Sequence, residues 1–177
     1  LDKTLPSLST VSIASDRSPG TFAKDGDVVT LTMVASETIS APVVTFKSGG
    51  VAITDTSIDY VNTTGNTWTA KYTADEDDTD GAVTFSAAIT DLAGNLNTFT
   101  AVTSGGGSVQ FDDTAPTISD VNIESNNSPG PKTHAKAGHV VTLSFTISEA
   151  IATPTAVFKS NGGSNLPDTV TYTNTNS

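Results

Sequence analysis

The chain has 177 residues, of which 36% are apolar, and 8 Lys and Arg against 19 Asp and Glu give it a net charge of −11. This charge repels phosphate groups, which argues against nucleic acid or an anionic membrane surface as a partner. The absence of Cys excludes disulfides, thiol catalysis and thiolate metal sites, and no apolar run approaches the roughly 18 residues that a membrane-spanning helix needs.

Short segments that alternate apolar with polar residues follow one another along the chain, separated by turn clusters such as SPG, KDGD and KSGG. In DVVTLTMVA, Val29, Leu31 and Met33 face one side, and Thr30 and Thr32 face the other. No window has a convincing helical period. We predict seven strands, A to G, at residues 8–14, 27–35, 42–47, 57–62, 67–73, 82–90 and 107–112.

One buried face per strand predicts two antiparallel sheets packed face to face. Seven short strands in about 110 residues are typical of an immunoglobulin-like Greek key. The predicted fold is therefore all-β, an immunoglobulin-like antiparallel β-sandwich, without the Cys pair of antibody domains.

The chain also repeats itself. FDDTAPTISDVNI, at residues 111–123, resembles the opening LDKTLPSLSTVSI, with Asp2 matching Asp112 at an offset of 110 residues. After two extra loop residues the offset becomes 112, and residues 28–50 then match residues 140–162 with 12 identities in 23 positions. A period of this length is too long for a solenoid and suits a self-contained sandwich domain.

These matches predict a complete repeat at residues 1–113 and, at residues 114–177, the N-terminal half of a second repeat with strands A to D. The half repeat lacks the large residues of strands E to G, a loss on the order of 10 kcal/mol of burial free energy, comparable to the whole net stability of a domain. We hypothesise that it pairs with another copy as a homodimer, and that the chain was cut from a longer array of like units.

The elements FDDTAPT, DGDVVTLT, SETI and ITDLAGN together resemble the bacterial immunoglobulin-like repeats of large surface adhesins and biofilm-associated proteins. The resemblance covers nearly the whole chain. It implies an extracellular address on the bacterial cell surface and calcium at the junctions between repeats. The first linker departs from the pattern, because Lys3 stands where the second linker has Asp113.

Greek-key topology predicts which acidic residues meet. Asp112 and Asp113 of the linker are expected near Glu149 of the next B–C loop, and an equivalent set at the other pole of the first repeat comprises Asp2, Glu37, Asp91 and Asn95. Calcium takes six to eight such oxygen ligands, so both sets are candidate calcium sites. The alternative is that these residues are solvated turns, since Asp and Asn favour turns and excess acid keeps proteins soluble.

Catalytic patterns are lacking. Both His residues, His134 and His139, fall in the second repeat only, and GGG at residues 105–107 lacks the Lys of a phosphate loop. We therefore predict no enzyme, but an adhesive or structural repeat acting as a calcium-stiffened spacer, whose partners are the neighbouring repeats. The alternatives are a ligand-binding module for glycan or protein, or an accessory module of a secreted enzyme.

Overall fold

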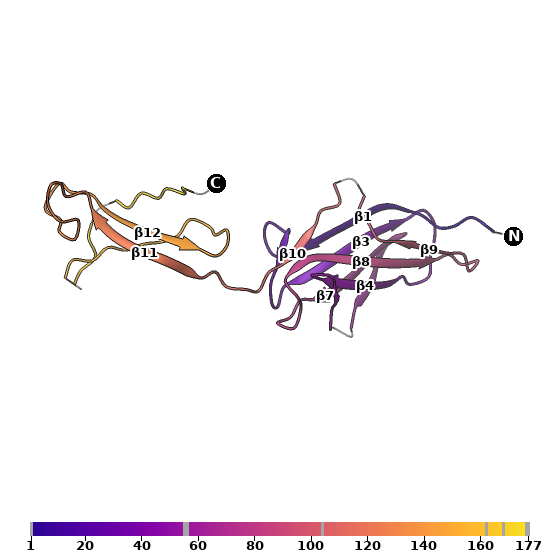
Figure 1. Ribbon diagram of the computed structural model, residues 1–177. Coiled ribbons are helices and arrows are strands. Elements are labelled where there is room, and N and C mark those ends of the chain that lie inside the picture. Colours follow the sequence, from indigo (N-terminus) through magenta and orange to yellow (C-terminus); the bar gives the residue numbers. More distant parts are fainter. Residues whose placement is uncertain (1, 55–56, 104, 162, 168, 176–177) are drawn as a thin grey trace. The chain divides into compact units, whose positions relative to one another are not determined.

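The computed structural model describes residues 2–54, 57–103, 105–161, 163–167 and 169–175 (Figure 1). The chain divides into two compact units, Leu1–Thr114 and Ala115–Ser177. Strands account for all the regular structure of the described residues. None of those residues belongs to a helix of the length and apolarity needed to cross a membrane.

The first sheet of the first unit has four antiparallel strands, in the order β1-β3-β7-β6. These are β1 (Leu8–Ser15), β3 (Val28–Ala35), β7 (Thr67–Thr73) and β6 (Asp59–Thr64). β3 is central, with Leu31 opposite Ile13 on one side and opposite Ala70 on the other. In the nomenclature of the sequence prediction this sheet contains strands A, B, E and D.

The second sheet has the order β2-β10-β8-β4-β5, with β9 also paired to β8. Its strands are β2 (Phe22–Ala23), β10 (Val109–Phe111), β8 (Gly81–Thr90), β4 (Val43–Ser48), β5 (Val51–Ala52) and β9 (Leu96–Phe99). Strands C, F and G thus lie together opposite A, B, E and D. This arrangement confirms the predicted immunoglobulin-like Greek-key sandwich.

The core lies between the two sheets, because each strand turns alternate side chains inward. β3 alternates buried with half-buried residues along its whole length, and β4 alternates buried with exposed ones. The rings of Phe46 and Tyr72 meet at 4.9 Å between centroids. The largest fully buried side chains include Tyr72, Phe46, Phe111, Leu31 and Met33.

The seven predicted strands of the first unit agree with the observed ones to within two residues at each end. The prediction missed β2, β5 and β9, which have only two to four residues. Segments this short carry no readable alternation. They exist because a neighbouring strand offers a backbone edge, as β10 does for β2 and β8 does for β9.

The second unit repeats the local structure of the first. Its strands β11 (Ile118–Ser125) and β12 (Val141–Ile147) pair antiparallel. Ile123 lies opposite Leu143, as Ile13 lies opposite Leu31. Hydrogen bonds recur as well, because the amide N–H of Thr117 donates to the Ser148 hydroxyl at 2.9 Å and that of Ser7 donates to the Ser36 hydroxyl at 3.0 Å.

The second unit differs from its prediction beyond β12. The segments expected as strands C and D form no regular strand among the described residues, although Lys159 and Asn165 make an isolated bridge. In the first unit, strand C (β4) pairs with β8 and strand D (β6) pairs with β7. No counterpart of β7 or β8 is present among the 177 residues, so these two segments lack the partners that would make them strands.

Substitution within β4 tests where the core lies. We expect Phe46→Ala to lower the free energy of unfolding of the first unit by about 3–5 kcal/mol, because a buried ring is replaced by a cavity. Val43→Ala, in the same strand at 65% exposure, should change it by less than about 1 kcal/mol. Urea unfolding followed by the fluorescence of Trp68, the single Trp, measures both. Equal losses would contradict the assigned core face.

Candidate metal centre

Three chain segments meet at one end of the first unit: the segment before β1, the connection after β3 and the turn after β8. The amide N–H of Ser36 donates to the Ser7 carbonyl at 2.8 Å, which ties the first segment to the second. Ile39 and Asp91 form an isolated antiparallel bridge, which ties the second segment to the third. The ends of three separated stretches of sequence are thus fixed side by side.

Asp91 organises the turn after β8. Its carboxylate accepts the amide N–H groups of Ala93 at 2.9 Å and Asn95 at 2.8 Å, and the side-chain amide of Asn95 at 2.7 Å. Gly94 adopts a φ of 93°, in the left-handed region that favours glycine. Asn95, which was predicted as a metal ligand, therefore lies beside Asp91, and its side-chain N–H donates a hydrogen bond to the Asp91 carboxylate.

The pKa of Asp91 is lowered, chiefly because the Asn95 side chain donates to the carboxylate and also through the backbone N–H groups of the turn. Asp91 is 3% exposed as a residue. These bonds fix both carboxylate oxygens in one orientation and favour the ionised form. Asp91 is thus a positioned anion at the base of a shallow site.

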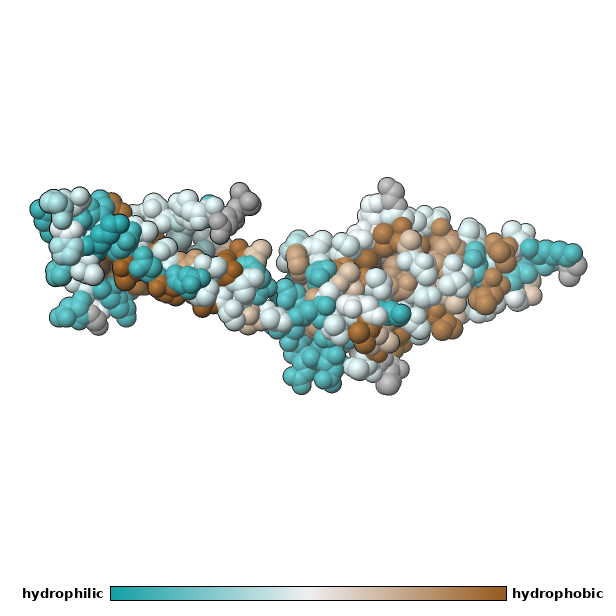
Figure 2. All heavy atoms as spheres, viewed as in Figure 1, coloured by the Kyte–Doolittle hydropathy of each residue, from teal (hydrophilic) through white to brown (hydrophobic). Residues whose placement is uncertain are grey.

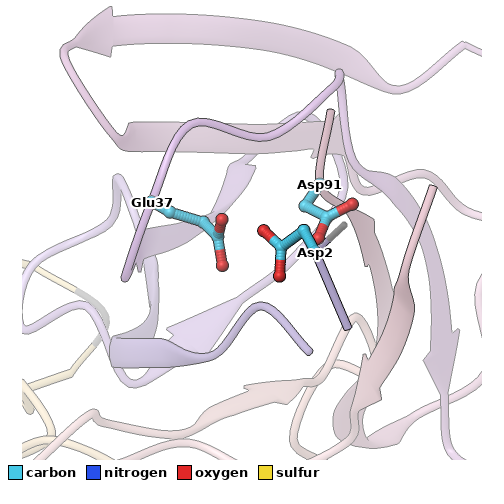
Figure 3. Close-up of side chains that lie close together, drawn as sticks. All are labelled: Asp2, Glu37 and Asp91. Carbon is cyan, nitrogen blue, oxygen red and sulfur yellow. The ribbon is translucent and has the colours of Figure 1, made fainter. Parts of the chain in front are cut away.

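Asp2 and Glu37 come to the same place from the other two segments. Single carboxylate oxygens of Asp2, Glu37 and Asp91 lie within 4.8 Å of one another, and the three carboxylates face a common space (Figure 3). The Thr4 amide N–H donates to Asp2 at 2.9 Å, which orients that side chain. Thr38, Leu92 and Ala93 line the same open hollow.

No ion pair among the described residues joins a cationic side chain to this cluster. In the part of the chain that the structure describes, ion pairs join Arg17 to Asp27 and Lys132 to Glu124, and neither includes a member of the cluster. Three carboxylates can supply three to six oxygens, depending on how many bind through both atoms, and calcium accepts carbonyl and water oxygens for the remainder. The residues present therefore fit a hard divalent cation such as calcium.

The opposite end of the first unit uses its acidic residues differently. Asp80 accepts the amide N–H of Asp113 at 2.9 Å and the hydroxyl of Thr114. The pKa of Asp80 is lowered, first by the Thr114 hydroxyl and then by the Asp113 amide. The Asp113 carboxylate in turn accepts the amide N–H of Asp25 at 3.3 Å. Asp80 thus fixes the chain where it leaves β10.

The hydrogen bonds that join Asp80 to residues 113 and 114 were not predicted from the sequence. No pattern links positions 34 residues apart, so only the fold brings them together. Asp27 is likewise occupied, because it accepts from the Arg17 guanidinium at 2.6 Å and from the Lys24 amide at 2.9 Å.

The second predicted metal set is divided between the two units. Asp112 and Asp113 belong to the first unit and Glu149 to the second. The Asp112 amide N–H donates to the Ala23 carbonyl at 2.9 Å, which continues the pairing of β10 with β2. A metal site composed of Asp112, Asp113 and Glu149 stays a prediction.

Comparison with known proteins finds no matching family model and no matching curated protein. Among solved structures, the titin M4 domain is similar with 17% identity over 64% of this chain and 100% of that one, at a TM-score of 0.36. The N-terminal Ig1-2 module of the Drosophila receptor protein tyrosine phosphatase DLAR has 10% identity over 78% and 83%, at a TM-score of 0.39. The immunoglobulin-like fold is assigned here from strand order and register.

The lowered pKa of Asp91 predicts a pH-dependent contribution to stability. A carboxyl whose pKa is lower in the folded state stabilises the fold above the unfolded pKa, and this contribution is lost as pH falls through the folded pKa. We expect Asp91→Asn to be less stable than wild type at pH 7 in chelator, and the difference to shrink below about pH 4. Urea unfolding between pH 7 and 3 measures it, with exposed Glu76→Gln as the control. A difference that does not change with pH would contradict the role of the charge.

Removing the Asp80 carboxylate tests how the C-terminal end of the first unit is fixed. We expect Asp80→Ala to speed hydrogen exchange at the Asp113 amide several-fold, because that N–H loses its acceptor. Glu76→Ala, a loss of charge in the same loop at an exposed position, should leave this amide unchanged. Exchange of the Asp113 amide is measured by NMR at pH 7 in wild type and both variants, and equal rates in wild type and Asp80→Ala would refute the contact.

Proposed function

We propose that this chain is a spacer of an extracellular bacterial surface protein, and that calcium bound by Asp2, Glu37 and Asp91 stiffens it. The observation that carries the proposal is the group of three carboxylates without a cationic partner among the described residues. These carboxylates come from the segment before β1, the connection after β3 and the turn after β8. An ion shared by all three would fix the incoming chain to the body of the domain.

The path of the chain through the first unit supports a spacer. Asp2 lies against Asp91, which follows the last residue of β8, and Asp113 lies against Asp80, which precedes its first residue. β8 has ten residues, which at about 3.3 Å per residue span roughly 33 Å. The chain therefore arrives at one end of the sandwich and leaves at the other (Figure 1). A domain of this kind adds its full length to an array.

The proposed location, on the surface of a bacterial cell, is supported by features of the sequence. The absence of Cys and the excess of 11 negative charges suit an exported repeat that depends on packing and on metal ions for its stability. The DDTAP linker and the ITDLAGN turn resemble those of bacterial surface repeats, and Asp91 and Asn95 are two of the residues of that turn. Binding to neighbouring repeats, and a part in adhesion or biofilm, belong to the same proposal.

A calcium titration of thermal unfolding tests the proposal. Extracellular calcium modules bind with dissociation constants of about 0.1–1 mM. At ten times the dissociation constant the stabilisation is about 1.4 kcal/mol, which raises the melting temperature of a domain of this size by roughly 5 °C. We expect this rise in wild type and its loss in the Asp2→Asn/Glu37→Gln double variant. Magnesium should have a smaller effect, because it dehydrates reluctantly.

The matched control is Asp59→Asn/Glu76→Gln, which removes the same number of charges from exposed positions outside the cluster. Its response to calcium should equal that of wild type, because the three ligands are intact. If the double variant of the cluster still responds fully to calcium, the ion binds elsewhere. If wild type does not respond, the domain is not stiffened by calcium.

A further inference from the structure

The second unit carries an apolar sheet face that its described residues leave largely exposed. Val121 and Ile123 are 64% and 59% exposed, whereas their equivalents Val11 and Ile13 are 1% and 4% exposed. An open groove runs along this face, and brown, hydrophobic spheres gather over β11 and β12 in Figure 2. Its main lining residues on the two strands are Ile118, Val121, Ile123, Leu143, Phe145 and Ile147.

The first unit provides an equivalent of this face in its covered state. There Val11, Ile13 and Leu31 belong to one buried cluster with side chains of the facing sheet and of β7. Besides Phe46 of β4, whose counterpart Phe158 is present in the second unit, the cluster includes five large side chains. They are Tyr72 of β7 in the same sheet, and Val83 and Phe85 of β8 and Val109 and Phe111 of β10 in the facing sheet. All five lie between residues 66 and 113, the stretch that supplies strands E, F and G.

The residues that meet this stretch are kept in the second repeat. Val11, Ile13, Val29 and Leu31 correspond to Val121, Ile123, Val141 and Leu143, which are identical in type. Met33 and Ala35 are replaced by the larger Phe145 and Ile147. The face therefore retains the chemistry that accepts strands E to G, with more volume at two positions.

Besides the exposed apolar face, the second unit has a strand edge that is unpaired among the described residues. β3 is paired on both sides, to β1 and to β7, whereas β12 is paired only to β11 among the described residues. An unpaired strand edge is a template for a further strand. The segment that corresponds to strand C is already held, because the Ala156 amide N–H donates to the Tyr172 hydroxyl at 3.0 Å, as that of Val44 donates to Tyr60 at 2.9 Å.

We propose that the second unit is a strand acceptor, and that its occupant is a set of β-strands with the sequence character of residues 66–113. The E-type strand adds to the open edge of β12, in the register that places Leu31 opposite Ala70 in the first unit. The F-type strand pairs with residues 155–158, as β8 pairs with β4. The aromatic side chains of this set then fill the groove.

A second copy of the same unit fits this surface less well. Packing two β11–β12 faces together would cover the apolar groove but leave both open edges of β12 unpaired. Pairing two β12 edges would satisfy the backbone but leave the apolar faces exposed to water. Strands of the E, F and G type satisfy the edge and the face together, as they do in the first unit.

The test adds a second copy of residues 66–113 after Ser177 of the full chain, in chelator so that the outcome is independent of calcium. We expect the edge amides of Val141–Ile147 to exchange more slowly by on the order of a hundredfold, with the protein monomeric by light scattering. A matched fusion carries Phe85→Asp in the added copy only, and it should lose this protection while the first unit stays intact.

Two results would overturn the proposal. One is unchanged exchange at β12 in the fusion, including a version with Phe145→Met and Ile147→Ala, which restores the face of the first repeat. The other is a dimer of the original chain in which the same amides are already protected, because a second copy would then be the occupant. If the wild-type chain does not respond to calcium but the β12 amides are protected in the fusion, the proposed function is contradicted and the strand-acceptor proposal stands.

Discussion

The structure depends on the burial of one sheet face against another. In the first unit, Leu31 and Ile13 on one sheet meet Phe46, Phe85 and Phe111 on the other, and all belong to a single core cluster. Burial of a large apolar side chain is worth about 1.5–3 kcal/mol, so some ten such residues outweigh every surface contact in the molecule. In the second unit, the described strands form one of these faces and not the other. The difference between the two units, which share several local hydrogen bonds, follows from this one contact.

Alternation was enough to predict the strands that have a buried face. β3, β7 and β8 could be read from the sequence because apolar and polar residues alternate over most of their seven to ten residues. β2, β5 and β9 could not, since backbone pairing with a neighbour decides their structure rather than side-chain pattern. Segments 155–158 and 169–174 show the converse case. Their sequence resembles that of strands C and D, but strand structure needs a partner as well as a pattern.

The candidate site was predictable to the extent that topology places loops. A Greek key brings the connection after strand B and the turn after strand F to the pole where strand A begins, and Asp2, Glu37 and Asp91 lie together there. The hydrogen bonds that each of these polar groups makes could not be predicted from the sequence. Asn95 and Asp91 both carry oxygens that suit a metal, yet the side-chain amide of Asn95 donates a hydrogen bond that orients the Asp91 carboxylate. The same composition at the other pole gives hydrogen-bonded acids, because Thr114 and the Asp113 amide lie within reach of Asp80.

The two ends of the first unit are therefore held by different physical means. At the C-terminal end, Asp80 accepts hydrogen bonds from the departing chain, namely from the Asp113 amide and the Thr114 hydroxyl. At the N-terminal end, Asp2 brings a third negative charge toward Glu37 and Asp91, and like charges at this separation repel one another. Without a cation, this repulsion opposes docking of the incoming chain; under the proposed function, a bound calcium ion would let the same charges hold the chain in place. If the proposed ion binds there, it would set how firmly the incoming chain is held, whereas the outgoing chain is held by hydrogen bonds to Asp80.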